Sequence, residues 1–274
     1  MRGEHGRAIE TGVFLGRIPY IRGGSGNRVA VVFFGANALF QPLDRARPQD
    51  YARMVARVLP AGYVYYILGY DRYPAPGYGF DAIVRDCFDI VREQMGRSVI
   101  IGVSFGGFVA QRFAAEHPEL VEKLVLLISA HRFSAEGWEK VFRQEAYMRQ
   151  RDLYGFIKDM ALLFRRPWYN WMLKLALWQG RRRLARTLND PDTMLRVYET
   201  LFSDFDNTRF LRRITVPTLV VGGTRDQFFD VEAFRETAAL IPGARLELFP
   251  GETHMVPLER SVAVRRVITR FLAA

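Results

Sequence analysis

One serine in the chain has a spacing of neighbours that suits nucleophilic chemistry. Ser104 lies at the centre of residues 102–106 (GVSFG), which fit the pattern G-x-S-x-G. Glycines two positions to either side let a strand and a helix pass closely, while the serine hydroxyl stays exposed on the sharp turn between them. The apolar run 98–103 predicts that strand, and residues 107–116 predict the helix. We therefore interpret Ser104 as a nucleophile.

A serine nucleophile needs a general base, and His254 is the best placed of the four histidines. It lies between the last predicted strand and the last predicted helix, where an imidazole can reach the carboxyl end of a parallel sheet. His117 ends the helix that begins at the serine and would lie ~20 Å away along its axis. His131 could line a pocket but is expected in a loop, and His5 lies in a charged N-terminal segment.

The third member of such a site is an acid that fixes the imidazole tautomer and stabilises the imidazolium. Asp226 ends the Gly-rich turn that follows the predicted strand 218–221, at the same sheet edge as the other two residues. Asp230 is the nearest alternative acid. Asp226 could also simply pair with Arg225 or another surface arginine.

Predicted strands and helices alternate along the chain, and they must position these residues. This alternation predicts an α/β fold with a parallel sheet that is buried on both faces. The GGSGN run at 23–27 predicts a tight, hairpin-like turn. The expected strands are 28–34, 63–68, 98–103, 124–129, 218–221 and 245–249, and the expected helices are 48–59, 81–94, 107–116, 231–240 and 261–271.

The pattern changes in the middle of the chain, where residues 131–213 show helical periodicity and little strand signal. We predict a helical cap there, between core parts at 1–130 and 214–274. The cap contains all four tryptophans and carries 17 basic and 10 acidic residues. Its residues Trp168, Trp171, Met172, Leu175 and Trp178 share one helical face. We expect that face to roof the site, and docking on a membrane through it and the arginines at 181–183 is the less favoured alternative.

The order Ser, Asp, His resembles that of the α/β-hydrolase superfamily, and the similarity runs over nearly the whole chain. It rests on the segments RIPYIRGG, VAVVFFGAN, GVSFGG, PTLVVGGTRD and FPGETHMVPLE. The resemblance implies an eight-stranded, mostly parallel sheet flanked by helices, with a cap inserted after the sixth strand. It also implies an oxyanion hole made by the N–H groups of Phe105 and Ala36, with Asn37 as an alternative to Ala36.

The chain departs from family patterns in two places. It has Phe34-Gly35 where many members have His-Gly, which leaves the backbone donors in place. Ser104 stands where haloalkane dehalogenases and epoxide hydrolases need an aspartate, and the HGGPG loop of proline iminopeptidases is absent. The glycines also fit neither a phosphate-binding P-loop nor a dinucleotide fingerprint.

The composition bears on disulfides, cellular compartment and cofactors. The single cysteine, Cys87, excludes an intrachain disulfide and is expected to be a buried apolar residue. The N-terminus shows no apolar run typical of a signal peptide, so a reducing cytoplasm is the expected compartment. The net charge of +10 comes almost wholly from arginine, without a nucleic-acid motif or a metal-ligand cluster. We expect no cofactor and no metal.

These residues together predict a hydrolase that cleaves carboxylic esters through an acyl-enzyme intermediate. The expected partner is a small or medium, largely apolar substrate in a pocket that includes Asn37, Trp168 and Trp171. A C–C bond hydrolase or thioesterase with the same triad is an alternative. A ligand-binding receptor on the same scaffold, with little turnover, is another. The sequence does not indicate an oligomeric state.

Overall fold

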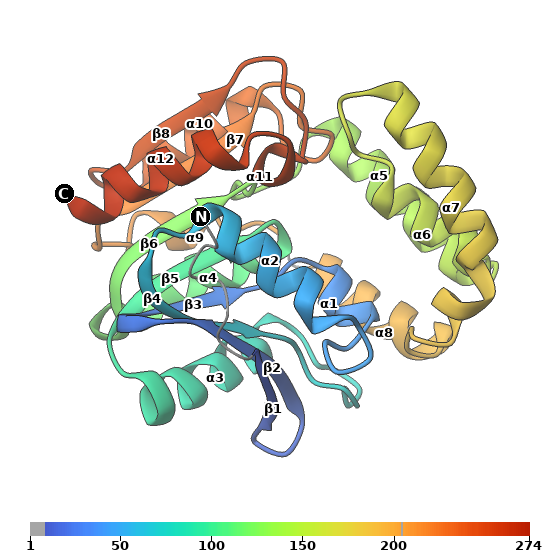
Figure 1. Cartoon of the computed structure of the whole chain (residues 1–274), viewed down its shortest axis with the longest axis horizontal. Helices are drawn as coiled ribbons and strands as arrows, with labels where there is room; N and C mark the ends of the chain where they lie inside the picture. Colours follow the sequence, from blue (N-terminus) through green and yellow to red (C-terminus); the bar gives the residue numbers. More distant parts are fainter. Residues whose placement is uncertain (1–8, 204) are drawn as a thin grey trace, which may run out of the picture.

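The computed structural model describes residues 9–203 and 205–274, and this part of the chain forms one eight-stranded sheet (Figure 1). The strand order is β1-β2-β4-β3-β5-β6-β7-β8. β1 and β2, and β2 and β4, pair antiparallel, and all other neighbours pair parallel. The expected eight-stranded, mostly parallel sheet is confirmed. The strands are β1 (Glu10–Phe14), β2 (Ile18–Gly24), β3 (Gly26–Phe33), β4 (Gly62–Leu68), β5 (Ser98–Val103), β6 (Val121–Leu127), β7 (Thr218–Gly223) and β8 (Arg245–Phe249).

The GGSGN turn does not make a hairpin, so that expectation is wrong. β2 and β3 lie on opposite sides of β4, which hydrogen-bonds to both of them. Gly26 has a φ of 143°, and a Cβ atom at this position would collide with the backbone of Gly62 at the start of β4. Glycine is needed here because the chain turns away at once to make room for the strand between.

Helices cover both faces of the sheet, whose central strands are buried along almost their whole length. α2 (Pro48–Val58) packs with α11 (Val256–Glu259) and α12 (Ser261–Ala273). A second group runs from α3 through α4 and α9 to α10 by successive contacts. Its members are α3 (Phe80–Ile90), which continues as the π-helical turn η1 (Val91–Met95), α4 (Phe105–Glu116), α9 (Thr208–Leu211) and α10 (Val231–Leu240). Two short helical turns, α1 (Asn37–Phe40) and η2 (Pro118–Leu120), complete the core.

Four helices inserted between β6 and β7 form a separate layer beside the core (Figure 1). They are α5 (Ala135–Arg149), α6 (Leu153–Ala161), α7 (Pro167–Ala185) and α8 (Pro191–Phe202). The side chains of Ser134, Asp152 and Asp190 cap α5, α6 and α8 at their N-termini. These caps satisfy backbone N–H groups that the helices leave without partners, so the insertion has well-defined local boundaries.

Candidate active site

Ser104 lies at the turn between β5 and α4 in a conformation that L-residues rarely adopt, with φ 52° and ψ −120°. The flanking glycines make this turn possible. A Cβ atom on Gly106 would collide with the carbonyl oxygen of Phe33, and one on Gly102 would lie 2.5 Å from the Cα atom of Gly107. Strain of this kind costs about 1–3 kcal/mol and is concentrated at functional sites. The turn holds the Ser104 hydroxyl at the carboxyl end of the sheet.

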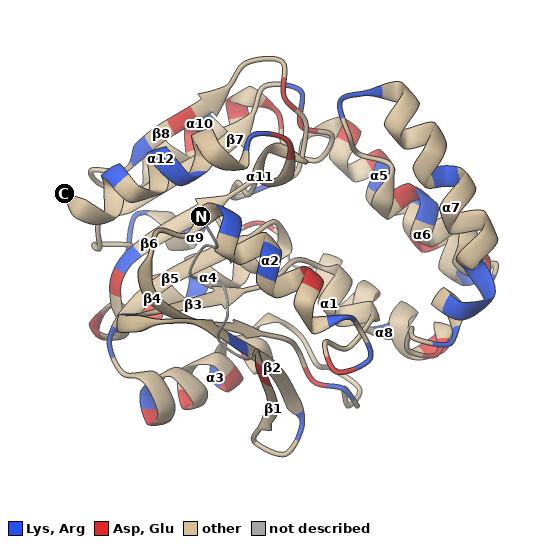
Figure 2. Ribbon diagram, viewed as in Figure 1, with Lys and Arg blue, Asp and Glu red and all other residues tan. Residues whose placement is uncertain are grey.

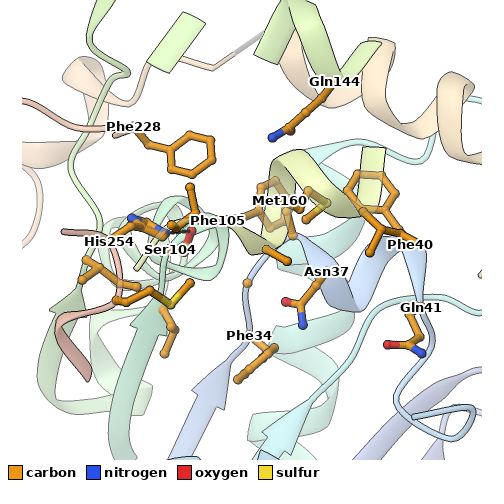
Figure 3. Close-up of a pocket in the computed structure, with 18 of the residues that line it drawn as sticks. Phe34, Asn37, Phe40, Gln41, Ser104, Phe105, Gln144, Met160, Phe228 and His254 are labelled. Atoms are coloured by element: carbon orange, nitrogen blue, oxygen red, sulfur yellow. Dashed lines mark hydrogen bonds between the residues drawn. The ribbon is translucent and has the colours of Figure 1, made fainter. Parts of the chain in front are cut away.

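The structure brings Ser104, His254 and Asp226 into one hydrogen-bonded row, and Figure 3 shows the side chains of Ser104 and His254 pointing toward one another. Nε2 of His254 lies 2.9 Å from Oγ of Ser104. Nδ1 of the same ring lies 2.7 Å from Oδ2 of Asp226. The imidazole is buried, and the ring of Phe228 meets it edge to face with 4.9 Å between centroids.

The two candidate acids have different surroundings. The Oδ1 atom of Asp226 accepts backbone N–H groups from Phe228 at 2.8 Å and Phe229 at 3.2 Å, so its carboxylate is held toward the imidazole. Asp230 instead accepts the N–H of Ala233 at 2.7 Å and caps α10. The geometry therefore favours Asp226 over Asp230 as the partner of the histidine.

Gln227 connects the acid loop, the base loop and the cap. Its Oε1 atom accepts the backbone N–H of His254 at 3.1 Å, and its Nε2 atom donates to the carbonyl of Leu163 at 3.1 Å. Glu252, buried two positions before the histidine, pairs with Arg165 of the cap at 3.3 Å and with Arg260 at 3.2 Å. These contacts fix the base loop and the cap in one arrangement.

The residues expected to supply an oxyanion hole lie beside the serine. A Cβ atom on Gly35 would lie 3.7 Å from that of Ser104, which places the loop after β3 against the candidate nucleophile. Ala36 and Phe105 both line the cavity at Ser104. The N–H of Phe105 is the first of α4 and therefore has no acceptor within the helix.

Asn37 also lines this cavity, as expected, although its side chain is already engaged. Its Nδ2 atom donates to the hydroxyl of Tyr51 at 3.1 Å. Burial raises the pKa of Tyr51 to about 12, so the phenol stays protonated at neutral pH. Asn37 is held by this contact and can offer its remaining amide groups to a ligand.

A cavity of about 360 Å³ opens above Ser104, between the core and the cap. Within the described part of the chain, its lining includes no Asp, Glu, Lys or Arg. Figure 3 shows Phe228 beside His254, with Gln144 and Met160 reaching in from the cap side. The polar side chains of the lining are Asn37, Gln41, Ser104, Gln144, Tyr198 and His254, and nearly all the others are aliphatic, aromatic or methionine.

Two tryptophans expected in this pocket are elsewhere, which corrects the sequence-based prediction. Trp168 and Trp171 are 55% and 67% exposed and do not line the cavity. The opposite face of α7 packs on α6, which lies between α7 and the core (Figure 1). Helical periodicity identified the apolar face but could not tell which side of the helix the neighbouring elements cover.

The cap residues that do line the cavity gave no signal in the sequence. Gln144 and Met160 are ordinary members of amphipathic helices, and only the docking of the cap places them over Ser104. Phe228 could have been suspected, because it follows Asp226 by two positions. His131 lies outside the lining, with Nδ1 3.0 Å from Oγ1 of Thr237. Cys87 is buried, as predicted, and burial raises the pKa of its thiol.

The described residues contain neither a metal-ligand cluster nor a helix that could span a membrane. No group of three or more His, Cys, Asp or Glu side chains there is arranged to hold a metal ion. No helix in residues 9–203 and 205–274 has the length and hydropathy needed to cross a bilayer.

The fold and the row of serine, histidine and aspartate define the class of α/β hydrolases. Residues 47–267 match the Alpha/beta hydrolase family, and the chain belongs to that family. The resemblance inferred from the sequence is thereby confirmed.

Individual proteins similar to this chain share only a modest fraction of identical residues with it. The chain is 26% identical to a pimeloyl-[acyl-carrier protein] methyl ester esterase of Vibrio atlanticus, over 65% of this chain and 74% of that protein. It is 22% identical to a 2-hydroxy-6-oxononadienedioate/2-hydroxy-6-oxononatrienedioate hydrolase of a Pseudomonas species, over 97% of this chain and 95% of the relative. The crystal structure of an enol-lactonase from Burkholderia xenovorans superposes with a TM-score of 0.74, at 20% identity, covering 97% of this chain and 100% of that one. That last likeness shows the shared fold.

Proposed function

We propose that this protein hydrolyses a carboxylic ester of a small or medium-sized, uncharged and largely apolar substrate. The observation that carries the proposal is the Ser104–His254–Asp226 row at the base of a cavity without charged lining. Burying a charged substrate group in such a cavity without a partner would be costly. Similarity to a methyl ester esterase of Vibrio atlanticus also supports ester chemistry.

The proposed reaction has two halves. In the first, Ser104 Oγ attacks the ester carbonyl carbon, and His254 Nε2 takes the hydroxyl proton. The oxyanion accepts hydrogen bonds from the N–H groups of Phe105 and Ala36, and the alcohol leaves with the proton from His254. Asp226 holds the tautomer that keeps Nε2 free to accept a proton and stabilises the imidazolium.

In the second half, water attacks the acyl-enzyme while His254 takes its proton, and the carboxylic acid departs as Ser104 regains a proton. Every step uses groups of this chain, the ester and water. The edge-to-face ring of Phe228 covers the imidazole and limits the access of bulk water to it.

A C–C bond hydrolase is the alternative suggested by the relative from Pseudomonas. The name of that relative's substrate denotes a dicarboxylate. In the described residues, the cavity offers no Arg or Lys to bind a carboxylate. The lining therefore favours an uncharged ester over a dicarboxylate of that kind.

Steady-state hydrolysis of p-nitrophenyl esters of rising acyl length tests the proposal. We expect kcat/KM to rise with chain length and then fall once the acyl chain outgrows the cavity. A matched thioester series and a dianionic C–C substrate serve as comparisons. The proposal fails if no ester is hydrolysed above the uncatalysed rate while either comparison substrate is turned over.

A further inference from the structure

The outward face of α7 is an apolar surface without a partner in this structure. Trp168, Trp171, Met172, Leu175 and Trp178 are all exposed, with Trp171 the most exposed of the tryptophans at 67%. They lie on the side of the helix opposite Leu173, Leu177 and Leu184, which are partly buried against the rest of the cap. Exposed apolar clusters of this kind on a folded protein mark interaction sites. We call the five exposed residues the α7 face.

Positive charge brackets the α7 face at both ends. Arg166 directly precedes the helix, and arginines 181–183 and Arg186 follow the last tryptophan, whereas residues 163–189 contain no acidic residue. None of the ion pairs among the described residues involves Arg166 or these four following arginines, whereas Arg165 is paired with Glu252. Figure 2 shows blue at both ends of α7 and a largely tan helix between them.

This combination fits one kind of partner. A helix with Trp and aliphatic residues on one face, and basic residues beside them, lies flat in the interface of a membrane, with its apolar face among the upper acyl chains. α7 has 19 residues and is therefore ~28 Å long, and its outer position in the cap lets the whole face meet a plane (Figure 1). Arginines at both ends would contact anionic head groups.

A second copy of the chain is a poorer fit. An interface between two identical α7 faces would bring two acid-free, arginine-bracketed segments together, and like charges juxtaposed at an interface are costly. We propose that the α7 face docks on anionic lipid surfaces. This reverses the preference of the sequence-based interpretation, which placed the same face over the active site. The proposal is independent of the reaction at Ser104.

Vesicle binding tests the docking directly. Three of the four tryptophans belong to the α7 face, so their fluorescence reports its environment. Vesicles of phosphatidylcholine with phosphatidylglycerol should sediment the protein and shift its emission to the blue at low salt. Pure phosphatidylcholine vesicles should do so weakly, and high salt should release the protein. Absence of binding to the anionic vesicles, or binding without an emission shift, would overturn the proposal.

Variants locate the surface. Trp171→Glu should lower the partition coefficient roughly 10-fold or more, since it puts a charge where the exposed indole would enter the lipid. The double variant Arg182→Gln and Arg183→Gln should lower it roughly 5-fold per arginine at low salt. Matched controls lie on the core: Tyr73→Ala removes an aromatic ring that is 70% exposed, and Arg266→Gln with Arg270→Gln removes two charges from α12. Equal losses in the controls and the α7 variants would contradict the assignment.

Sedimentation velocity without lipid tests the alternative that a second copy of the chain covers the α7 face. The docking proposal predicts a monomer whose sedimentation is unchanged by Trp171→Glu. A dimer that dissociates in Trp171→Glu would assign the α7 face to a second copy and overturn the lipid proposal. Unaltered thermal unfolding of each variant establishes that a loss of binding is not a loss of folding.

Discussion

The Nε2 atom of His254 lies 2.9 Å from the Oγ atom of Ser104, although 150 positions separate the two residues in the sequence. The sheet causes this proximity. Ser104 follows β5, and His254 follows β8, and both strands end at the same edge. Asp226 follows β7 at that edge and completes the row from the other side of the ring. Three loops on a rigid sheet therefore build the candidate site.

Replacing each of the two candidate acids in turn should show that Asp226, and not Asp230, supports the histidine. Asp226→Asn should lower kcat about 10⁴-fold, because an amide favours the wrong imidazole tautomer. Asp230→Asn is the matched control, since Asn caps a helix about as well as Asp and α10 should keep its N-cap. The rates of ester hydrolysis by the two variants show which aspartate orients His254. A larger loss in Asp230→Asn would show that the wrong carboxylate has been assigned.

The cavity lining should set the preference for acyl chain length. Met160 lines the cavity from the cap, so Met160→Trp should shorten the acyl chain that is hydrolysed best. Each methylene excluded from the cavity should cost about 0.8 kcal/mol, or about fourfold in kcat/KM. Trp171→Ala is the control, because Trp171 is exposed and should leave the preference unchanged. If Trp171→Ala shifted the preferred acyl length as much as Met160→Trp does, the assignment of Met160 and not Trp171 to the cavity would be contradicted.

The glycine that follows the candidate nucleophile by two positions should tolerate no side chain. A Cβ atom on Gly106 would collide with the carbonyl oxygens of Phe33 and Phe34, which are backbone atoms of the sheet. Gly106→Ala should therefore destabilise the fold by ~3 kcal/mol or more. Gly180→Ala in α7 is the control, since the nearest atom to its Cβ would be 3.9 Å away, and it should stabilise the helix slightly. Urea unfolding of both variants checks the prediction, which equal stabilities would refute.

His131 should make the stability of the fold depend on pH. Burial, with a contribution from Arg132, lowers the pKa of His131, against the opposing effects of Asp206 and Glu236. The unfolded chain therefore takes up this proton first as the pH falls below about 6.5, and the free energy of unfolding decreases there. His131→Gln should lose less stability between about pH 7.5 and about pH 5.5 than the parent protein does. Urea unfolding at the two pH values measures this, and an equal loss in both proteins would contradict it.

Local sequence was sufficient to nominate the three candidate active-site residues, because each of them lies in a short turn after a strand. A glycine-flanked serine after an apolar strand, and an aspartate and a histidine after later strands, are visible as short patterns. The parallel sheet follows from the same alternation. The position of β4 between β2 and β3 was not visible, since it depends on a long-range pairing that a run of glycines does not encode.

The cap shows the opposite situation. Its helices follow from periodicity, but their docking depends on contacts made by half-buried side chains on several helices. Leu173 and Leu177 of α7 pack inward, while the larger tryptophans at 168, 171 and 178 face outward. Hydrophobicity alone assigns the tryptophans to the interior, so the sequence-based interpretation placed the wrong face over the site. The proposed docking of this face on lipid would account for its outward aromatic residues.

Replacement of Ser104 by alanine tests whether this residue is the nucleophile. The variant removes only the Oγ atom and leaves His254, Asp226 and the cavity in place. We expect Ser104→Ala to unfold at the parent's temperature and to lose on the order of 10⁶ in kcat for the best p-nitrophenyl ester. A folded Ser104→Ala protein that keeps more than about one per cent of the parent's activity would contradict the assignment of Ser104 as the nucleophile.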